Sequence, residues 1–133
     1  MFSVPTRTQY GIRALVNLAR SPTHSTSAAE IARAESISPK YLEGIMTQLK
    51  SKGIVLAERG KNGGYRLSRA PEDIRMLDVV EALEGEVRPV DCVEDRSCCA
   101  QGGACLPRRF WIGLKESIDG YLASNTLKDV IEP

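Results

Sequence analysis

Apolar residues recur with a helical period in the first part of the chain. From Thr6 to Arg20 they are spaced three and four residues apart, which places them on one face of a helix: Ile12, Leu15, Val16 and Ala19. Ser21-Pro22 ends this helix, because the residue before a proline disfavours the helical region. A capping box, Ser27-Ala28-Ala29-Glu30, then predicts a short second helix that ends near Glu35.

A third helix follows after a short turn. Ser38 supplies an N-cap hydroxyl and Pro39 occupies the first helical position, while Lys52-Gly53 supplies a basic last turn and a glycine terminator. Its apolar stripe consists of Leu42, Ile45, Met46 and Leu49. Two short helices joined by a few residues, of which the second is capped, basic and amphipathic, are typical of a helix-turn-helix.

Two short strands are predicted directly after the helix-turn-helix. They span Ile54 to Glu58 and Gly64 to Ser68. Between them, Arg59-Gly60-Lys61-Asn62-Gly63 is rich in residues that tolerate positive φ, as the tip of a hairpin requires. A basic hairpin in this position is a wing.

The second half of the chain contains two further helices separated by an irregular segment. Pro71-Glu72-Asp73 is expected to start the first of them, which ends at Gly85 and buries Ile74, Leu77, Val80 and Leu83. Residues 86–106 show no periodicity. Pro107 opens the last long helix, and a short tail from Thr126 to Ile131 follows it.

The last helix carries a continuous apolar stripe: Phe110, Leu114, Ile118, Tyr121 and Leu122. The stripe can pack against its own domain or against a second subunit. Helix-turn-helix proteins usually bind two half-sites as symmetric dimers, so dimerisation through residues 107–123 is favoured.

The predicted fold class is therefore mainly α with a small β wing. We divide the chain into a winged helix-turn-helix DNA-binding domain over residues 1–85, a cysteine-containing loop that binds a cluster over residues 86–106, and a dimerisation helix with its tail over residues 107–133.

Composition excludes several classes of protein. With 133 residues, of which 42% are hydrophobic and 26% charged, the chain can bury a core without disulfides. No apolar run approaches the ~20 residues that span a bilayer. Residues 1–10 contain no apolar stretch typical of an export signal, which predicts a cytoplasmic protein. The chain has no set of histidine, carboxylate and nucleophile and no phosphate loop, so we expect neither an enzyme nor a small-molecule substrate.

The net charge of +1 conceals an uneven distribution of charge. Residues 1–70 carry 11 Lys and Arg against 4 Asp and Glu, whereas residues 71–133 carry 7 against 13. A basic segment beside an acidic one is typical of a protein with one face that binds a polyanion. Because the basic residues gather on a helix-turn-helix and a wing, the expected partner is double-stranded promoter DNA.

On this interpretation the helix that begins at Pro39 enters the major groove. The residues expected to contact DNA are Ser38, Lys40, Tyr41, Glu43, Arg59, Lys61 and Arg66. A carboxylate is repelled by phosphate, so Glu43 is better suited to accept a hydrogen bond from cytosine N4. Alternatively, Glu43 has a local role, either as a cap or as an ion-pair partner of Lys40 or Lys50. Arg59 is placed to enter a minor groove, and affinity is expected to fall steeply with salt.

All four cysteines lie in the irregular segment. Cys92, Cys98, Cys99 and Cys105 fall within 14 residues, close enough to converge on one soft metal centre. Structural zinc sites favour paired cysteines separated by two to four intervening residues, and this spacing is absent. The wide spacing favours an iron–sulfur cluster, with one of the adjacent Cys98 and Cys99 as a ligand. Zinc, a thiol–disulfide sensor without metal, and inert cysteines are the alternatives.

The chain resembles the Rrf-two type family of winged helix-turn-helix regulators, typified by the iron–sulfur regulator IscR and the nitric-oxide sensor NsrR. The resemblance covers nearly the whole length. Its residues are Tyr10-Gly11, Ile37-Ser38, Tyr41-Leu42-Glu43, Arg59-Gly60, Gly63-Gly64-Tyr65, the cysteines and Thr126-Leu127. It implies a homodimer that binds promoter DNA, with a cluster held near the dimer helix whose ligation or loss shifts DNA binding.

Two ligands of the family are missing from this sequence. Arg108 stands where IscR-like members have a histidine three residues after the last cysteine, and Gln9 stands where NsrR-like members have an aspartate. The fourth ligand is then the second thiol of the Cys98-Cys99 pair, a residue of the partner subunit or a small exogenous molecule. The spacing of the cysteines is compatible with both a [2Fe-2S] and a [4Fe-4S] cluster.

The sequence thus predicts a transcriptional regulator that senses redox, nitric oxide or iron–sulfur status through its cluster. One alternative is a regulator that senses thiol oxidation without a cluster. The other is a metal or redox carrier that does not bind DNA, against which the basic half and the wing argue.

Overall fold

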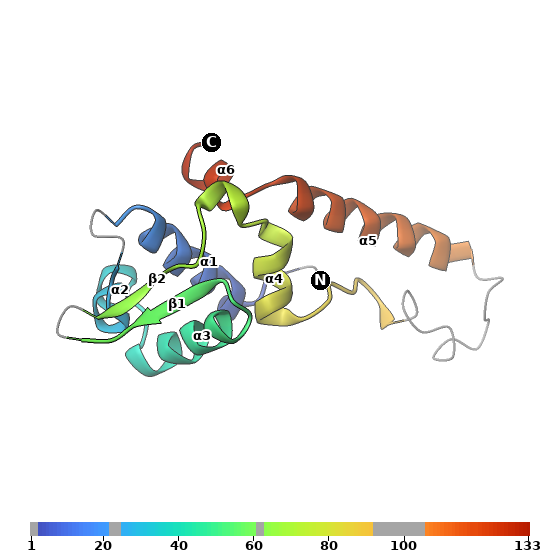
Figure 1. The fold of residues 1–133 in the computed structure, drawn as a ribbon. Helices are drawn as coiled ribbons and strands as arrows, with labels where there is room; N and C mark the ends of the chain where they lie inside the picture. The colour runs from blue at the N-terminus through green and yellow to red at the C-terminus, as the bar shows by residue number, and fades with distance from the viewer. Residues whose placement is uncertain (1–2, 22–24, 61–62, 92–105) are drawn as a thin grey trace.

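Six α-helices, one short 3-10 helix and two strands make up the part of the chain described by the computed structural model, which covers residues 3–21, 25–60, 63–91 and 106–133 (Figure 1). Their bounds are α1 (Thr6–Ala19), α2 (Ala28–Glu35), α3 (Pro39–Ser51), β1 (Val55–Glu58), β2 (Gly64–Leu67), η1 (Pro71–Asp73), α4 (Met76–Glu84), α5 (Leu106–Ser124) and α6 (Leu127–Ile131). The mainly helical fold with a two-stranded wing is confirmed.

Capping residues define the helix-turn-helix as expected. The Ser27 side chain accepts from the Glu30 amide, and the Glu30 carboxylate accepts from the Ser27 amide, which completes the capping box of α2. Ser38 caps α3 by accepting from the Tyr41 amide at 3.4 Å. Between the two helices, Ser36 takes a left-handed conformation that turns the chain.

The wing is an antiparallel hairpin in which Val55 pairs with Leu67 and Glu58 with Gly64. It is fixed to the body by a bridge between Thr26 and Tyr65, with backbone hydrogen bonds of 2.9 and 2.8 Å. A Cβ atom at Gly64 would lie 2.5 Å from the Thr26 carbonyl oxygen, so only glycine allows this close approach.

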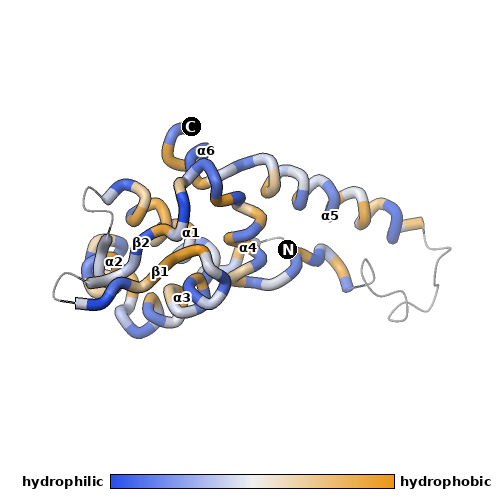
Figure 2. Tube along the Cα trace, viewed as in Figure 1, coloured by the Kyte–Doolittle hydropathy of each residue, from blue (hydrophilic) through white to orange (hydrophobic). Residues whose placement is uncertain are grey.

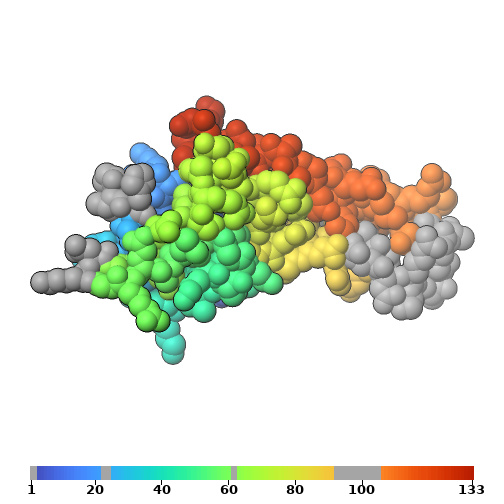
Figure 3. Space-filling model, in the orientation of Figure 1, coloured from blue at the N-terminus to red at the C-terminus, as the bar shows by residue number. Residues whose placement is uncertain are grey.

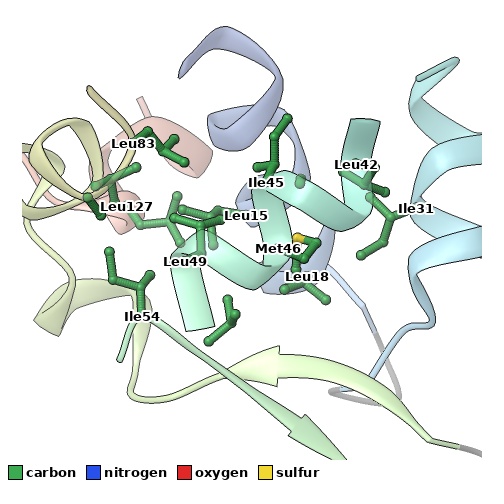
Figure 4. Packing of buried hydrophobic residues seen from close by; sticks show 14 of the residues in the cluster. Leu15, Leu18, Ile31, Leu42, Ile45, Met46, Leu49, Ile54, Leu83 and Leu127 are labelled. Carbon is green, nitrogen blue, oxygen red and sulfur yellow. The ribbon is translucent and has the colours of Figure 1, made fainter. Parts of the chain in front are cut away.

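One hydrophobic core joins α1, α2, α3, β1, α4 and α6 (Figure 4). Leu15 of α1, Leu42, Ile45, Met46 and Leu49 of α3 are fully buried in it. Leu127 is also fully buried, and its amide donates to the Ile74 carbonyl at 2.9 Å. The residues grouped above as a tail therefore contribute to the same hydrophobic core as α1, α3 and α4.

The fourth helix begins later than expected. Pro71–Asp73 form only a 3-10 turn, because Ile74 and Arg75 are extended and Arg75 bridges to Thr126. The helix restarts at Met76, and its buried residues are Met76, Val79, Ala82 and Leu83. The expectation of burial at Leu77 and Val80 was wrong, since both are only partly buried.

The apolar stripe of α5 is divided between two faces. Leu122 packs against the core and Ile118 lies on the α4 side, where both line a cavity of about 550 Å³ with Val4, Pro5, Val80 and Val87. Phe110 and Tyr121 point away and are 68% and 69% exposed. Figure 2 shows hydrophobic and hydrophilic residues alternating along this helix. Within the described ranges, no helix combines the length and apolar character needed to cross a membrane.

Candidate nucleic-acid interface

The side of α3 opposite the core forms an open polar surface. Its exposed residues are Lys40, Glu43, Gly44, Thr47, Lys50 and Ser51. They recur every three or four residues, so they lie on one face of the helix, with Leu42, Ile45, Met46 and Leu49 buried behind them. Figure 3 shows α3 and the strands of the wing next to one another at the surface. Thr47 and Gly44 were not among the residues singled out from the sequence, although the same helical period points to them.

Tyr41 borders this surface and is held by contacts with α1. Its ring meets Tyr10 edge to face, with centroids 5.9 Å apart, and the Arg13 guanidinium lies 5.5 Å from the centroid of Tyr10. The Tyr41 side chain is 38% exposed. Ser38, whose hydroxyl caps α3, is exposed beside it. Both side chains therefore have defined positions next to the exposed face.

Glu43 is exposed on this surface, between Lys40 and Lys50 around the helix. In the described part of the chain it forms no ion pair with Lys40 or Lys50, which are themselves exposed on the same face. The local pairing considered above is therefore not formed in the free protein. The carboxylate is available to accept a hydrogen bond from a base.

In the wing, the arginines differ in their surroundings. Arg59 is exposed just after β1. Arg66 pairs across the hairpin with Glu58, and the two side chains are 43% and 41% exposed. Lys61, the third wing residue expected to contact DNA, lies outside the described residues. The charge of Arg59 is thus exposed to solvent, whereas the charge of Arg66 is partly neutralised by the ion pair with Glu58.

A hydrogen-bond network fixes α3 to the end of α4. Gln48 donates to the carbonyl oxygens of Ala82 at 2.9 Å and Leu83 at 3.2 Å. Its own side-chain oxygen accepts from Arg7 Nε at 2.8 Å, and Arg7 also donates to the Gly44 carbonyl at 3.3 Å. The sequence reasoning missed Gln48 and Arg7, because no local pattern indicates a partner more than thirty residues away.

The segment that follows α4 is connected to α5 by charged side chains. Lys115 of α5 lies 3.4 Å from Glu86 and 2.6 Å from Asp119, and its hydrogen bond to Asp119 raises the pKa of the lysine ammonium. Figure 1 shows the start of α5 at the end of the molecule opposite the wing. The ion pair between Lys115 and Glu86 thus ties α5 to the segment that follows α4.

The predicted metal ligands Cys92, Cys98, Cys99 and Cys105 lie outside the described residues. Among the residues that are described, no three His, Cys, Asp or Glu side chains are arranged to hold a metal ion. The donor chemistry of the sequence itself fits an iron–sulfur cluster, since cysteine thiolates are its usual ligands.

Comparison with known proteins places this fold and surface in a family. The family model described as "Rrf2: Iron-dependent Transcriptional regulator" matches residues 4–133. The chain is 36% identical to Protein rrf2 of Nitratidesulfovibrio vulgaris over 95% of this chain and 85% of that protein. It is 34% identical to the HTH-type transcriptional regulator IscR of Cereibacter sphaeroides over 96% of this chain and 85% of that protein.

The fold itself is similar to a solved regulator. The structure of CymR, described as the global cysteine regulator of B. subtilis, superimposes with a TM-score of 0.82 at 32% identity, covering 99% of this chain and 98% of that chain. CymR of Bacillus subtilis and IscR of Cereibacter sphaeroides, which each match 96% of this chain, are both HTH-type transcriptional regulators. The chain therefore belongs to the Rrf2 family of transcriptional regulators.

Proposed function

We propose that this protein binds promoter DNA as a homodimer in the cytoplasm and senses redox, nitric-oxide or iron–sulfur status through a cluster bound by its cysteines. The observation that carries the DNA-binding part is the exposed face of α3, with Lys40, Glu43, Thr47 and Lys50 beside the wing. On this face two lysines suit phosphates, while Glu43 and Thr47 suit base edges. Arg59 supplies a cation for the minor groove.

A homodimer is supported by the outer face of α5. Leu106, Phe110 and Tyr121 are exposed on that face, and Gly113, Ser117 and Gly120 lie between them. Large apolar side chains that flank small residues allow a second helix to approach closely. A second copy of this chain would cover these side chains and place two α3 helices on two half-sites.

Glu43→Ala tests whether Glu43 reads a base. The variant is expected to lose about 1–3 kcal/mol of discrimination at the base pair that Glu43 contacts, because one base-specific hydrogen bond disappears. The measurement is the Kd for the operator and for a set of operators substituted one base pair at a time. Lys40→Ala is the matched variant on the same helix face: it should weaken binding to all sequences alike and reduce the salt slope by about one. Equal discrimination in wild type and Glu43→Ala would show that Glu43 does not read a base.

Reconstitution with iron and sulfide without oxygen tests the sensing part. We expect visible absorbance, with iron and sulfide bound, in the wild-type protein, and loss of both in Cys92→Ala and Cys105→Ala. Cys98→Ala and Cys99→Ala form a matched pair: if three thiols bind the cluster, one of these two variants keeps its iron and the other loses it.

The same reconstituted protein also distinguishes a cluster-based sensor from a sensor that works by thiol oxidation. CymR of Staphylococcus aureus, which is 26% identical with a TM-score of 0.77, has a solved structure described as an oxidized form, so a sensor that works by thiol oxidation is the second candidate. Colourless protein with four free thiols, whose DNA affinity changes on mild oxidation, would contradict the cluster and support this thiol sensor. A protein that binds iron but no duplex DNA in any state would instead be a metal carrier.

A further inference from the structure

The part of the chain between residues 86 and 124, which includes the cysteines, begins and ends at α4. It starts just after the end of α4, where Glu86 is paired with Lys115 of α5 at 3.4 Å. It returns to the start of α4 at Asn125, whose carbonyl accepts from the Met76 amide at 2.9 Å. Figure 1 shows α4 between α5 and α3, and α4 contacts both. A change in the cysteine segment is therefore expected to reach α4 before it reaches α3.

Gln48 joins α3 to the end of α4 with every hydrogen-bonding position of its side chain. Its amide nitrogen donates to the Ala82 and Leu83 carbonyl oxygens, and its oxygen accepts from both Nε and Nη2 of Arg7. A glutamine side chain has two donor hydrogens and one oxygen with two lone pairs, so all four positions are used. The last carbonyls of a helix have no partner within the helix, and Gln48 supplies donors for two of them in α4. Among the described residues, Gln48 makes the side-chain hydrogen bonds between α3 and α4.

Contacts with α1 hold the end of α4 in place independently of Gln48. Thr8 of α1 is buried, and its hydroxyl donates to Glu84 Oε1 at 2.7 Å. Leu83 packs in the core against Gly11 of α1, where a Cβ atom would collide with Leu83 Cδ1. The fold of α4 therefore does not depend on Gln48. The hydrogen bonds of Gln48 add a fixed position of α3, and of its exposed face, relative to α4.

We propose that Gln48 is a positioning residue that couples the cysteine segment to α3, because its hydrogen bonds to the end of α4 transmit a displacement of α4 to the exposed face of α3. This inference rests on the proposed sensing function and adds the contact through which that function acts. The partners of Gln48 are the α4 carbonyls and Arg7, so its effect on DNA binding passes through the position of α3. Without these hydrogen bonds, α3 takes the same position whatever the state of the cysteines.

The test uses Gln48→Glu and Gln48→Met in the full-length protein. A carboxylate at position 48 still accepts from Arg7 but cannot donate to the two carbonyls, and methionine makes neither contact without adding a charge. The Kd for operator DNA is measured for the reduced, cluster-free protein and for the protein reconstituted with iron and sulfide; for a thiol sensor, mildly oxidised protein replaces the reconstituted one. The wild-type Kd is expected to differ between the two states by about fivefold or more, as in other allosteric proteins, and the Kd of both variants by less than about twofold. The iron content of the reconstituted variants should equal that of the wild type.

Arg7→Ala is the comparison variant, because it removes the contact with α1 and leaves the donors of Gln48 on the α4 carbonyls. It also removes one positive charge. It is therefore expected to weaken DNA binding by the same factor in both states and to keep the wild-type ratio of the two Kd values.

Each other outcome would overturn the proposal. If the Gln48 variants had a lower Tm and weaker DNA binding but kept the wild-type ratio of Kd values, Gln48 would only stabilise the packing of α3. If Arg7→Ala also lost the ratio, the coupling would run through α1 and not through the contact with α4. If the wild-type protein had the same Kd in every state of its cysteines, the proposed sensing function itself would be refuted, and this result is obtained from the wild type alone.

Discussion

Leu127→Ala is expected to lower the free energy of unfolding by about 2–5 kcal/mol, as is usual when a buried leucine is truncated and leaves a cavity. Leu127 is fully buried in the core, and its amide donates to the Ile74 carbonyl. One residue earlier, Thr126 bridges to Arg75, and the Met76 amide donates to the Asn125 carbonyl at 2.9 Å. Loss of the leucine side chain therefore weakens the attachment of the C-terminal residues to the start of α4.

Urea denaturation followed by circular dichroism measures this effect. Val130→Ala is the matched control on the same short helix, because Val130 is 42% exposed and should change the stability by less than about 1 kcal/mol. If the two variants lost equal stability, the packing of Leu127 in the core would be refuted. If Leu127→Ala were as stable as the wild type, α6 would contribute nothing to the free energy of unfolding.

The double variant Phe110→Asp, Tyr121→Asp is expected to be a monomer and to lose about 10²–10⁴-fold in affinity for an operator with two half-sites, because binding through two linked sites is replaced by binding through one. Both side chains are more than two-thirds exposed on the outer face of α5, so aspartate there leaves the core of the protomer intact. In a dimer, however, it would bury unpaired charges.

Light scattering after gel filtration measures the oligomeric state, and titration with operator DNA measures the affinity. Lys128→Asp, at an exposed position of α6, changes the net charge by the same amount as the double variant. It therefore reports how much affinity is lost to long-range repulsion of DNA alone. A double variant that stayed dimeric would place the dimer interface elsewhere.

Several parts of the fold follow from short-range signals in the sequence. The capping box at Ser27 and the Ser38-Pro39 pair predict where α2 and α3 begin, since a cap is formed by atoms at most a few residues apart. The glycines between residues 59 and 64 predict the hairpin for the same reason. The exposed face of α3 also follows from local sequence, because the helical period determines which residues are opposite the buried leucines.

The start of α4 could not be predicted in this way. Pro71-Glu72-Asp73 has the composition of a helix N-terminus, yet Ile74 and Arg75 are extended because they pair with residues 126 and 127. The role of Gln48 has the same character, since its partners are Arg7 on α1 and two carbonyls at the end of α4. Such contacts join segments that are far apart in the sequence. Patterns among neighbouring residues therefore cannot predict them.

The sequence by itself determined the helix-turn-helix, the wing, the basic character of both and the grouping of four thiols in one segment. These properties depend on residue type and on spacings of a few residues, which local geometry converts directly into structure. Only the tertiary structure decided that Leu127 completes the core and that the stripe of α5 has an inner and an outer face. The reason is that burial is a property of the packed chain: an apolar residue is buried only where another segment arrives to cover it.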